Sequence, residues 1–249
     1  MLALLKFELR EAFDSVPWTV YYWIFFAFQY FVYGQLVSRL VVAVSDYYVY
    51  YGTGLIIIMT FNIGSWAGRR FVESAHEGRL KYILSLPVTR GQLFLEQLLL
   101  GLAVNVVRVG PPLVILSILG GLPTSVLLVS LVVLLLMSVG VMGMMISLSF
   151  VAFKSFDIYS AIVASMSALL LRFSTILYPL AFMPTSYAAV SLANPLTYGA
   201  DLFRSVLGVD ANQLLSPELS AFVVIAVGIS TLTVGTMLVP RVLEGVKSS

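Results

Sequence analysis

The most constraining feature of this sequence is a series of six long apolar segments joined by short connections. A helix needs about 20 mostly apolar residues to cross the hydrocarbon core of a bilayer. Each of the six segments is long enough, so the sequence predicts an all-α membrane protein with six transmembrane helices. The expected spans are Trp18–Val37, Tyr47–Ala67, Leu93–Leu119, Ser125–Ala152, Ile158–Leu180 and Leu219–Val239.

The composition agrees with a single membrane domain over residues 1–249. Hydrophobic residues make up 60% of the chain and charged residues only 10%, whereas a soluble domain carries roughly a quarter charged residues. The net charge of +2 is too small and too thinly spread to indicate a nucleic-acid partner. The absence of cysteine and the single histidine exclude thiol catalysis and disfavour a metal site.

The distribution of Lys and Arg predicts the orientation, because basic residues in short loops are retained on the cytoplasmic side. With the N-terminus inside, only Arg39 and Arg204 are external, while Arg108 and Arg172 lie within spans. We therefore expect a multi-pass protein of the cytoplasmic membrane with both termini in the cytoplasm. The expected cytoplasmic set is Lys6, Arg10, Arg69, Arg70, Arg79, Lys81, Arg90, Lys154, Arg241 and Lys247.

Residues 1–15 have the pattern of an interfacial amphipathic helix. At 100° per residue one face is apolar and the rest is charged, which suits a helix in the headgroup region. A frayed polar leader is the alternative. Pro17 and Trp18 mark the bend into the first span, which we expect to remain in the protein because no small-residue cleavage site closes it.

Residues 68–92 form the only long charged segment of the sequence. Apolar residues recur at helical spacing between Phe71 and Leu86, and Gly78 and Pro87 interrupt the pattern. This segment is expected either to dock a cytoplasmic partner or to be a solvated, positively charged loop.

Residues 181–218 are too apolar for a free external loop and too short for two full spans. Pro184 and Pro195 suit the first turns of helices, Asn194 suits an N-cap and Gly208 suits a C-terminal stop. The sequence therefore predicts two short helices, about 184–192 and 195–207, that enter the outer leaflet as a re-entrant hairpin. Irregular backbone at that depth requires surrounding protein or a water-filled cavity, so the hairpin is expected to be the lid or wall of a cavity.

Polar side chains on the expected outer side suggest an ion pair and a cluster of tyrosines. Asp201 and Arg204 are three residues apart on one predicted helix and are expected to pair. The tyrosine cluster near the start of the second span fits an outer interfacial belt, with ligand stacking as the alternative. This cluster comprises Tyr47, Tyr48, Tyr50 and Tyr51.

Arg108 and Arg172 are candidates for function because a charge inside a membrane costs several kcal/mol unless it is paired, hydrated or snorkelling. A rise of 1.5 Å per residue puts each roughly 21 to 23 Å from the cytoplasmic end of its span. They could line a path for an anionic head group, with Ser174 and Tyr178 close to Arg172 in sequence. The alternative is that each snorkels or pairs with an external acid.

Two features of the third and fourth spans bear on packing. Pro111 and Pro112 remove two backbone donors and are expected to kink or unwind the third span. The fourth span carries small residues that permit close helix approach, as packing in lipid requires. These small residues are Ser138, Gly140, Gly143 and Ser147.

The sequence lacks the motifs of a transport ATPase and of a membrane-embedded metalloprotease. A transport ATPase needs a GxxxxGK(S/T) loop to hold the phosphates, and the sequence has none. The HExxH pattern fails because no second His follows His76 and Glu77. We therefore expect no catalytic site and no cofactor on this chain, and any ATP-driven transport would use ATP and Mg²⁺ on another polypeptide.

Two stretches resemble the ABC-2 type membrane subunits of bacterial and archaeal ABC exporters, which include daunorubicin-type drug and polysaccharide or lipo-oligosaccharide export permeases. Residues 77–90 read EGRLKYILSLPVTR and resemble the family's E-G-T-L-E-x-L-L-x-S/T-P-V/I-S/T-R segment beside its coupling helix. The sequence departs from that pattern at Arg79, Lys81 and Leu86. The second stretch comprises residues 174–180, Met183 and Pro184, residues 194–198, Asp201 and Arg204.

The resemblance implies the membrane subunit of an ATP-driven exporter of an amphipathic, drug-like or lipid-like substrate. It implies a homodimer, or a heterodimer with a similar permease, surrounded by membrane lipid and bound to two cytoplasmic ABC ATPase subunits. Alternatives are export of a lipid-linked polysaccharide or oligosaccharide, and a non-transporting membrane assembly subunit. The residues expected to couple to the ATPase are Glu73, His76, Glu77, Gly78, Arg79 and Pro87, and those expected at the external gate are Pro184, Asn194 and Pro195.

Overall fold

The computed structural model describes residues 16–39, 47–85, 89–152, 155–209 and 215–247. Over these residues the chain is helical and contains no strand, which confirms the all-α class. The expected interfacial helix at 1–15 and the coupling candidate Pro87 lie outside the described residues.

Three helices of the described chain are long and apolar enough to cross a membrane. They are α6 (Arg90–Leu119), α7 (Thr124–Val151) and α11 (Pro217–Lys247), in which the apolar part reaches Leu238. They correspond to the third, fourth and sixth expected spans.

The other three expected spans are helical but less regular or less apolar. The first consists of α2 (Val16–Phe28), the π-helical segment η1 (Gln29–Gly34) and α3 (Gln35–Ser38). The second, α4 (Tyr47–His76), begins with tyrosines and carries two arginines near its other end, and the fifth, α8 (Phe156–Arg172), has only 17 residues. The count of six spans therefore stays a prediction.

Helix α7 lies at the centre of the molecule, with α4, α6, α10 and α11 packed around it. Its small residues are buried, as expected from the sequence. A Cβ atom on Gly143 would lie 2.7 Å from Thr231 Oγ1 of α11, so only glycine permits this approach. By contrast, Pro111 and Pro112 do not unwind the third span, because α6 continues as one helix through both residues. A kink at these prolines stays a prediction.

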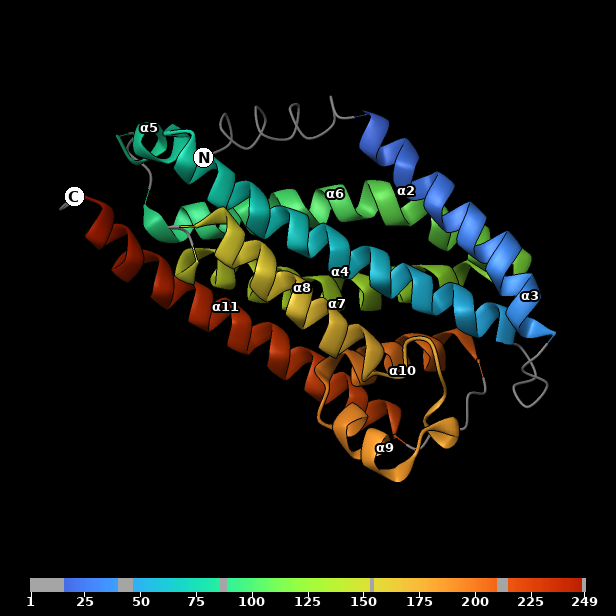
Figure 1. Ribbon diagram of the computed structural model, residues 1–249. Helices are drawn as coiled ribbons and strands as arrows, with labels where there is room; N and C mark the ends of the chain where they lie inside the picture. The colour runs from blue at the N-terminus through green and yellow to red at the C-terminus, as the bar shows by residue number, and fades with distance from the viewer. Residues whose placement is uncertain (1–15, 40–46, 86–88, 153–154, 210–214, 248–249) are drawn as a thin grey trace.

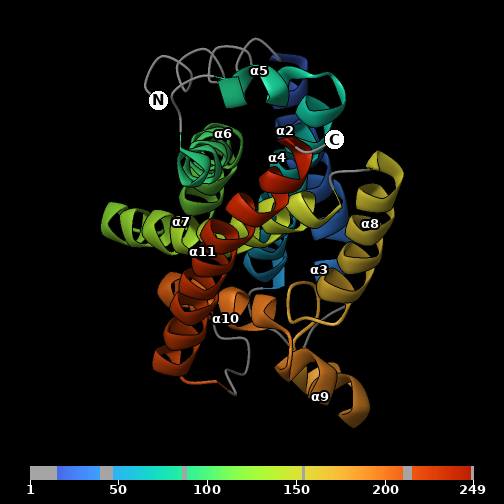
Figure 2. The ribbon, with the colours of Figure 1, turned by 90° about the vertical axis from the view of Figure 1, so that its left-hand side faces the viewer.

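The short helices lie at opposite ends of the bundle, as Figures 1 and 2 show. At one end α4 is followed by α5 (Arg79–Ser85). At the other end lie α9 (Thr185–Leu192), α10 (Pro195–Leu207) and the 3₁₀ turn η2 (Leu180–Phe182). Helix α11 runs from the α9–α10 end to the α5 end (Figure 1). The molecule thus has two chemically different ends connected by long helices.

The cap signals between α9 and α10 predicted the bounds of both helices well. Asn194 caps α10 by accepting a hydrogen bond from Leu196 N at 3.0 Å, Pro195 occupies the first turn, and Gly208 stops the helix in the left-handed conformation at φ 68°. Their depth in a membrane stays a prediction.

Helix α8 ends at Arg172 and not at Leu180, so the expected end of the fifth span is wrong. The physical reason is a cap from another element. Asn194 Nδ2 donates to the carbonyls of Leu170 and Phe173, each at 2.7 Å. These bonds satisfy backbone groups that a helix end leaves without intrahelical partners, so the chain leaves the helix here at little cost.

Candidate functional site

A cavity of about 320 Å³ lies between α2, α4, α6 and α8. Aromatic side chains dominate its wall, and two arginines and a few small polar groups complete it. Helix α2 contributes Trp18, Tyr21, Tyr22 and Phe25, helix α4 contributes Phe61, Asn62, Ser65, Trp66 and Arg69, α6 contributes Arg108, and α8 contributes Val163 and Ser167.

Arg108 lies at the closed side of this cavity, with only 2% of its surface exposed. Its guanidinium carbon is 5.1 Å from the ring centroid of Trp66 and 5.3 Å from that of Tyr22. Cation–π contacts of this kind partly replace the hydration that a buried charge loses. Arg108 therefore lies at a cavity, while its role in a substrate path stays a prediction.

Arg69 is the second cation of the cavity, although its sequence position predicts a place in the cytoplasmic loop. Helix α4 continues to His76, so Arg69 lies on the same helix as the cavity residues Asn62, Ser65 and Trp66. Positions i, i+3, i+4 and i+7 share one face of a helix. This spacing was the signal in the sequence that could have identified Arg69.

Helix α8 is fixed against α4 beside the cavity. Tyr159 Oη donates to the carbonyl of Ser65 at 2.9 Å, and a Cβ atom on Gly68 would collide with the same hydroxyl and lie 2.5 Å from Met145 O. The glycine therefore lets α4, α7 and α8 meet at one point, which sets the width of the cavity.

The other proposed pathway residues do not line this cavity. Arg172 is exposed at the end of α8, and Tyr178 is exposed in the irregular chain that follows. Ser174 is buried and donates to Leu171 O at 3.0 Å. Arg108 and Arg172 therefore do not share a site.

Arg204 is the centre of a buried polar cluster at the α9–α10 end. Its Nη1 and Nη2 atoms donate to the carbonyls of Thr175 and Ile176 at 2.6 Å, and its Nε atom donates to Thr53 Oγ1 at 3.0 Å. The guanidinium carbon lies 3.5 Å from the ring centroid of Tyr50, whose hydroxyl also donates to Thr175 O. We call these residues the Arg204 cluster; it holds the irregular chain after α8 between α10 and α4.

The expected pairing of Asp201 with Arg204 is not the main contact of either residue. Asp201 Oδ1 accepts a hydrogen bond from Thr175 Oγ1 at 3.2 Å, whereas Arg204 donates to the carbonyls and Thr53. Carbonyls freed by the end of α8 outcompete the carboxylate because they face the guanidinium in the interior.

The tyrosines at the start of α4 contact protein and do not form a simple lipid-facing belt. Tyr47 and Tyr50 are buried, and Tyr47 Oη donates to Leu177 O at 3.2 Å. Tyr51 Oη donates to Gln29 Oε1 at 3.0 Å, and the Tyr48 ring lies 4.1 Å from that of Tyr30. Their hydroxyls therefore bind the irregular chain after α8 and the π-helical segment η1.

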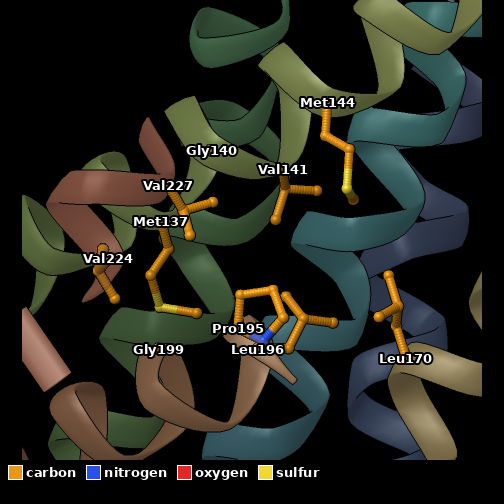
Figure 3. A pocket seen from close by; sticks show the side chains of 10 residues that line it. All are labelled: Met137, Gly140, Val141, Met144, Leu170, Pro195, Leu196, Gly199, Val224 and Val227. Atoms are coloured by element: carbon orange, nitrogen blue, oxygen red, sulfur yellow. The ribbon is translucent and has the colours of Figure 1, made fainter. Parts of the chain in front are cut away.

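Two of the three gate candidates take part in packing the α9–α10 end. Asn194 is buried between α8 and α10, whereas Pro184 is exposed directly before α9. Pro195 lines a small apolar pocket of about 40 Å³ (Figure 3). Met137 and Val141 of α7 and Leu170 of α8 also reach this pocket, so α10 rests on the central helices through an apolar contact.

The turn between α4 and α5 presents the coupling candidates. Gly78 adopts φ 76°, a conformation that favours glycine and ends α4 sharply. Glu73, His76 and Glu77 are exposed around it, and Arg79 Nε lies 3.0 Å from Glu77 Oε2 in an exposed ion pair.

Apolar neighbours of this turn are buried, as the amphipathic pattern requires. Phe71 packs on Phe150 of α7 at 4.1 Å between ring centroids, and Leu80 is also buried. The turn therefore has a charged outer face on an apolar base that rests on the bundle.

Two further observations concern titratable groups. Over the part of the chain that the structure describes, no three His, Cys, Asp or Glu side chains gather to hold a metal ion. Glu96 of α6 is 2% exposed. Its place inside the expected third span was the signal that could have identified it as a buried charge.

Comparison with protein families matches this architecture to a known group. The model of the ABC-2 type transporter family matches residues 1–207. The chain belongs to the ABC-2 type transporter family. A search of the curated proteins found no significant match.

The matched range of the ABC-2 family ends at Leu207, the last residue of α10, and includes the turn between α4 and α5, the cavity and the Arg204 cluster. Proteins of this family are membrane components of ABC transporters and usually pair with an ABC ATPase. The expected family is therefore confirmed, and so is a location in a membrane, whereas the cytoplasmic membrane and the orientation of the termini stay predictions.

Proposed function

We propose that this chain is the membrane subunit of an ATP-driven ABC exporter, and that it moves an amphipathic substrate outward across the cytoplasmic membrane. It works as a pair, with a second copy or a similar permease, on two cytoplasmic ATPase subunits that bind ATP and Mg²⁺. The non-catalytic chain supplies the path and the ATPase supplies the energy.

One observation carries this proposal: a single helix, α4, takes part in all three polar sites. Thr53 near one end belongs to the Arg204 cluster, Trp66 and Arg69 line the cavity, and His76 at the other end adjoins the charged turn. At 1.5 Å per residue, Thr53 lies about 20 Å and His76 about 15 Å from Trp66 along the axis. A rigid element that touches all three can link movement at the turn to the cavity and the outer end.

The membrane arrangement that we propose has six spans, with α5 on the cytoplasmic side. The segment α2–η1–α3, α4 and α8 complete the set formed by α6, α7 and α11. Arg70 and Arg79 lie near the α5 end, in agreement with the retention of basic residues in the cytoplasm. The α9–α10 hairpin then faces outward, where it re-enters the outer leaflet and closes the external side.

The cavity favours transport over a non-transporting assembly role. A structural subunit needs no space that is lined by aromatic and cationic groups, since voids weaken packing. A carrier of amphipathic molecules does need such a space.

The experiment that tests the proposal exchanges the charges of the turn. The variant E77R/R79E keeps an ion pair between the two positions but reverses the order of charges that a docked subunit meets. The variant is studied in complex with the ATPase that purifies with this chain. We expect the membrane subunit to no longer change the rate of ATP hydrolysis, so that the complex and the ATPase alone have similar rates. The measurement compares ATPase rates per complex with those of the ATPase alone.

The matched control is Glu218→Arg, which changes an exposed carboxylate at the opposite end, in the first turn of α11. We expect this variant to couple normally. Unchanged hydrolysis in E77R/R79E, with both subunits still bound, would contradict the assignment of the turn as the coupling surface.

A further inference from the structure

We propose that the cavity between α2, α4, α6 and α8 binds an anionic amphiphile, that is, a molecule with one phosphate or carboxylate head on a hydrocarbon body. This inference rests on the proposed export function, for which it names the class of substrate. Arg108 and Arg69 take the head group, and the aromatic residues of α2 and α4 take the hydrocarbon.

The charge of the cavity lining indicates an anionic ligand. Both ionisable groups with a full charge in the wall are guanidinium groups, and no residue of the described chain that lines the cavity is acidic. A guanidinium offers planar pairs of donors that match the oxygens of phosphate or carboxylate. The local field therefore favours an anion and opposes a cationic drug-like molecule.

The exposed fractions of the lining side chains indicate a ligand with one polar end and one apolar end. Trp18 and Tyr21 are 60% and 52% exposed, whereas Tyr22 is 9% and Arg108 only 2% exposed. The cavity thus passes from an aromatic rim at Trp18 and Tyr21 to a floor at Arg108, and Arg69 lies at a more exposed position of the wall. A head group at the floor would place its attached hydrocarbon against the rim, which is the polarity of an amphiphile.

The rings at the floor already hold Arg108 in place. Trp66 and Tyr22 lie on its guanidinium at 5.1 and 5.3 Å, so the planar group is oriented before a ligand arrives. Preorganised donors lose less conformational freedom on binding. Asn62 and Ser167 add neutral polar groups to the wall that can bind further head-group oxygens.

The volume sets the size of the bound part. A cavity of about 320 Å³ is at the lower end of ligand pockets, which run from roughly 300 to 1,000 Å³. It holds a head group and a few carbons, and the remaining hydrocarbon extends past the aromatic rim. A large, rigid drug-like polycycle would not fit within one copy of this cavity.

The test uses the tryptophans of the chain, of which there are three. Trp18 and Trp66 line the cavity and Trp23 does not. In the variant W18F/W23F, Trp66 is the only indole and reports on the cavity floor. The protein is placed in phosphatidylcholine nanodiscs without its ATPase, and the probe is a fatty acid with bromine near its carboxyl end, since bromine quenches indole fluorescence on contact.

We expect saturable quenching by the brominated acid and only weak, non-saturating quenching by its uncharged methyl ester. Arg108→Gln should weaken binding of the acid about tenfold, as expected for one charged hydrogen bond. Arg69→Gln should weaken it by a smaller factor, because Arg69 lies at a more exposed position. The control Arg172→Gln removes an exposed arginine outside the cavity and should leave binding unchanged.

Two competitors distinguish the sources of an anion. Displacement of the brominated acid by phosphatidylglycerol in the disc would assign the site to a bilayer lipid, and no displacement would assign it to a single-chain amphiphile; both support the proposal. Displacement by inorganic phosphate at the concentration of the fatty acid would show a plain anion site and overturn it.

Equal quenching by the acid and the ester would also overturn the proposal, as would unchanged binding in both Arg69→Gln and Arg108→Gln. If Arg108→Gln does not fold, Arg69→Gln and Arg108→Lys decide the question, since lysine keeps the charge but lacks the planar fork. The assay needs no ATPase, so a failure here leaves the coupling test of the turn intact, and a failure there leaves this one intact.

Discussion

At the residue scale, the arginines of this chain divide into roles that sequence position alone does not reveal. Arg108 was expected within a span and lies in the cavity, whereas Arg204 was expected in an external segment and is 1% exposed. The spacing of Asp201 and Arg204 correctly puts them on one helix, but it cannot show the carbonyls of Thr175 and Ile176. Those carbonyls become available only because α8 ends early, which is a tertiary effect.

Arg204 is therefore expected to be a stability residue. Arg204→Gln removes the donors to the buried carbonyls of Thr175 and Ile176, and each stranded polar group costs about 1–3 kcal/mol. We expect the unfolding free energy to fall by about 3 kcal/mol or more, seen as a lower Tm of the detergent-solubilised protein. Arg204→Lys should not restore it, because an ammonium lacks the planar fork.

The comparison for this experiment is Arg172→Gln, which replaces an exposed arginine at the end of α8. Its Tm should stay close to that of the unchanged protein. A Tm of Arg204→Gln that equals that of Arg172→Gln would show that the Arg204 cluster does not hold the α9–α10 end.

At the element scale, local cap signals predicted the helices that start and stop by their own side chains. Asn194, Pro195 and Gly208 fixed α10 at the expected bounds. The end of α8 escaped prediction because its cap, Asn194, is 22 residues away from Arg172 in sequence but adjacent in space. In the same way, packing of Phe71 on α7 lets α4 continue into the expected coupling loop. Because the helix continues, Arg69 lies at the cavity.

Asn194 should be worth more than an ordinary cap, since it serves two helices. Its Oδ1 atom accepts from Leu196 N in α10 and its Nδ2 atom donates to two carbonyls at the end of α8. A single N-cap adds about 1 kcal/mol to the free energy of unfolding. We therefore expect Asn194→Ala to lower the free energy of unfolding by about 2–3 kcal/mol. Thermal unfolding in detergent measures the loss.

Ser155→Ala is the matched single cap, because the Ser155 side chain accepts from Ile158 N at the start of α8. This variant should lower the free energy of unfolding by about 1 kcal/mol or less. A loss at Asn194 no larger than that at Ser155 would mean that the bonds across to α8 contribute nothing to stability.

At the scale of the whole molecule, hydropathy predicted six spans, of which α6, α7 and α11 are long and apolar enough to cross a membrane and the other three stay predictions. The reasons differ between these three spans. The π-helical segment η1 interrupts the first span after Phe28, α4 carries tyrosines at one end and Arg69 and Arg70 near the other, and α8 has only 17 residues. All three spans line the cavity, together with α6. The family motifs fall at the two ends of the bundle to which we assign function, but the cavity could be recognised only from the three-dimensional arrangement.

The central claim is that α4 transmits the state of the ATPase from the charged turn to the cavity. The most direct measurement places a single cysteine at Asn62, an exposed cavity residue of α4, in a chain with no native cysteine. The rate of thiol labelling is measured in the complex without nucleotide and in the complex trapped with ATP, Mg²⁺ and vanadate. We predict a change of several-fold between the two states, and its loss when E77R/R79E is added. Equal rates in both states, or a change that persists in the E77R/R79E background, would contradict the claim.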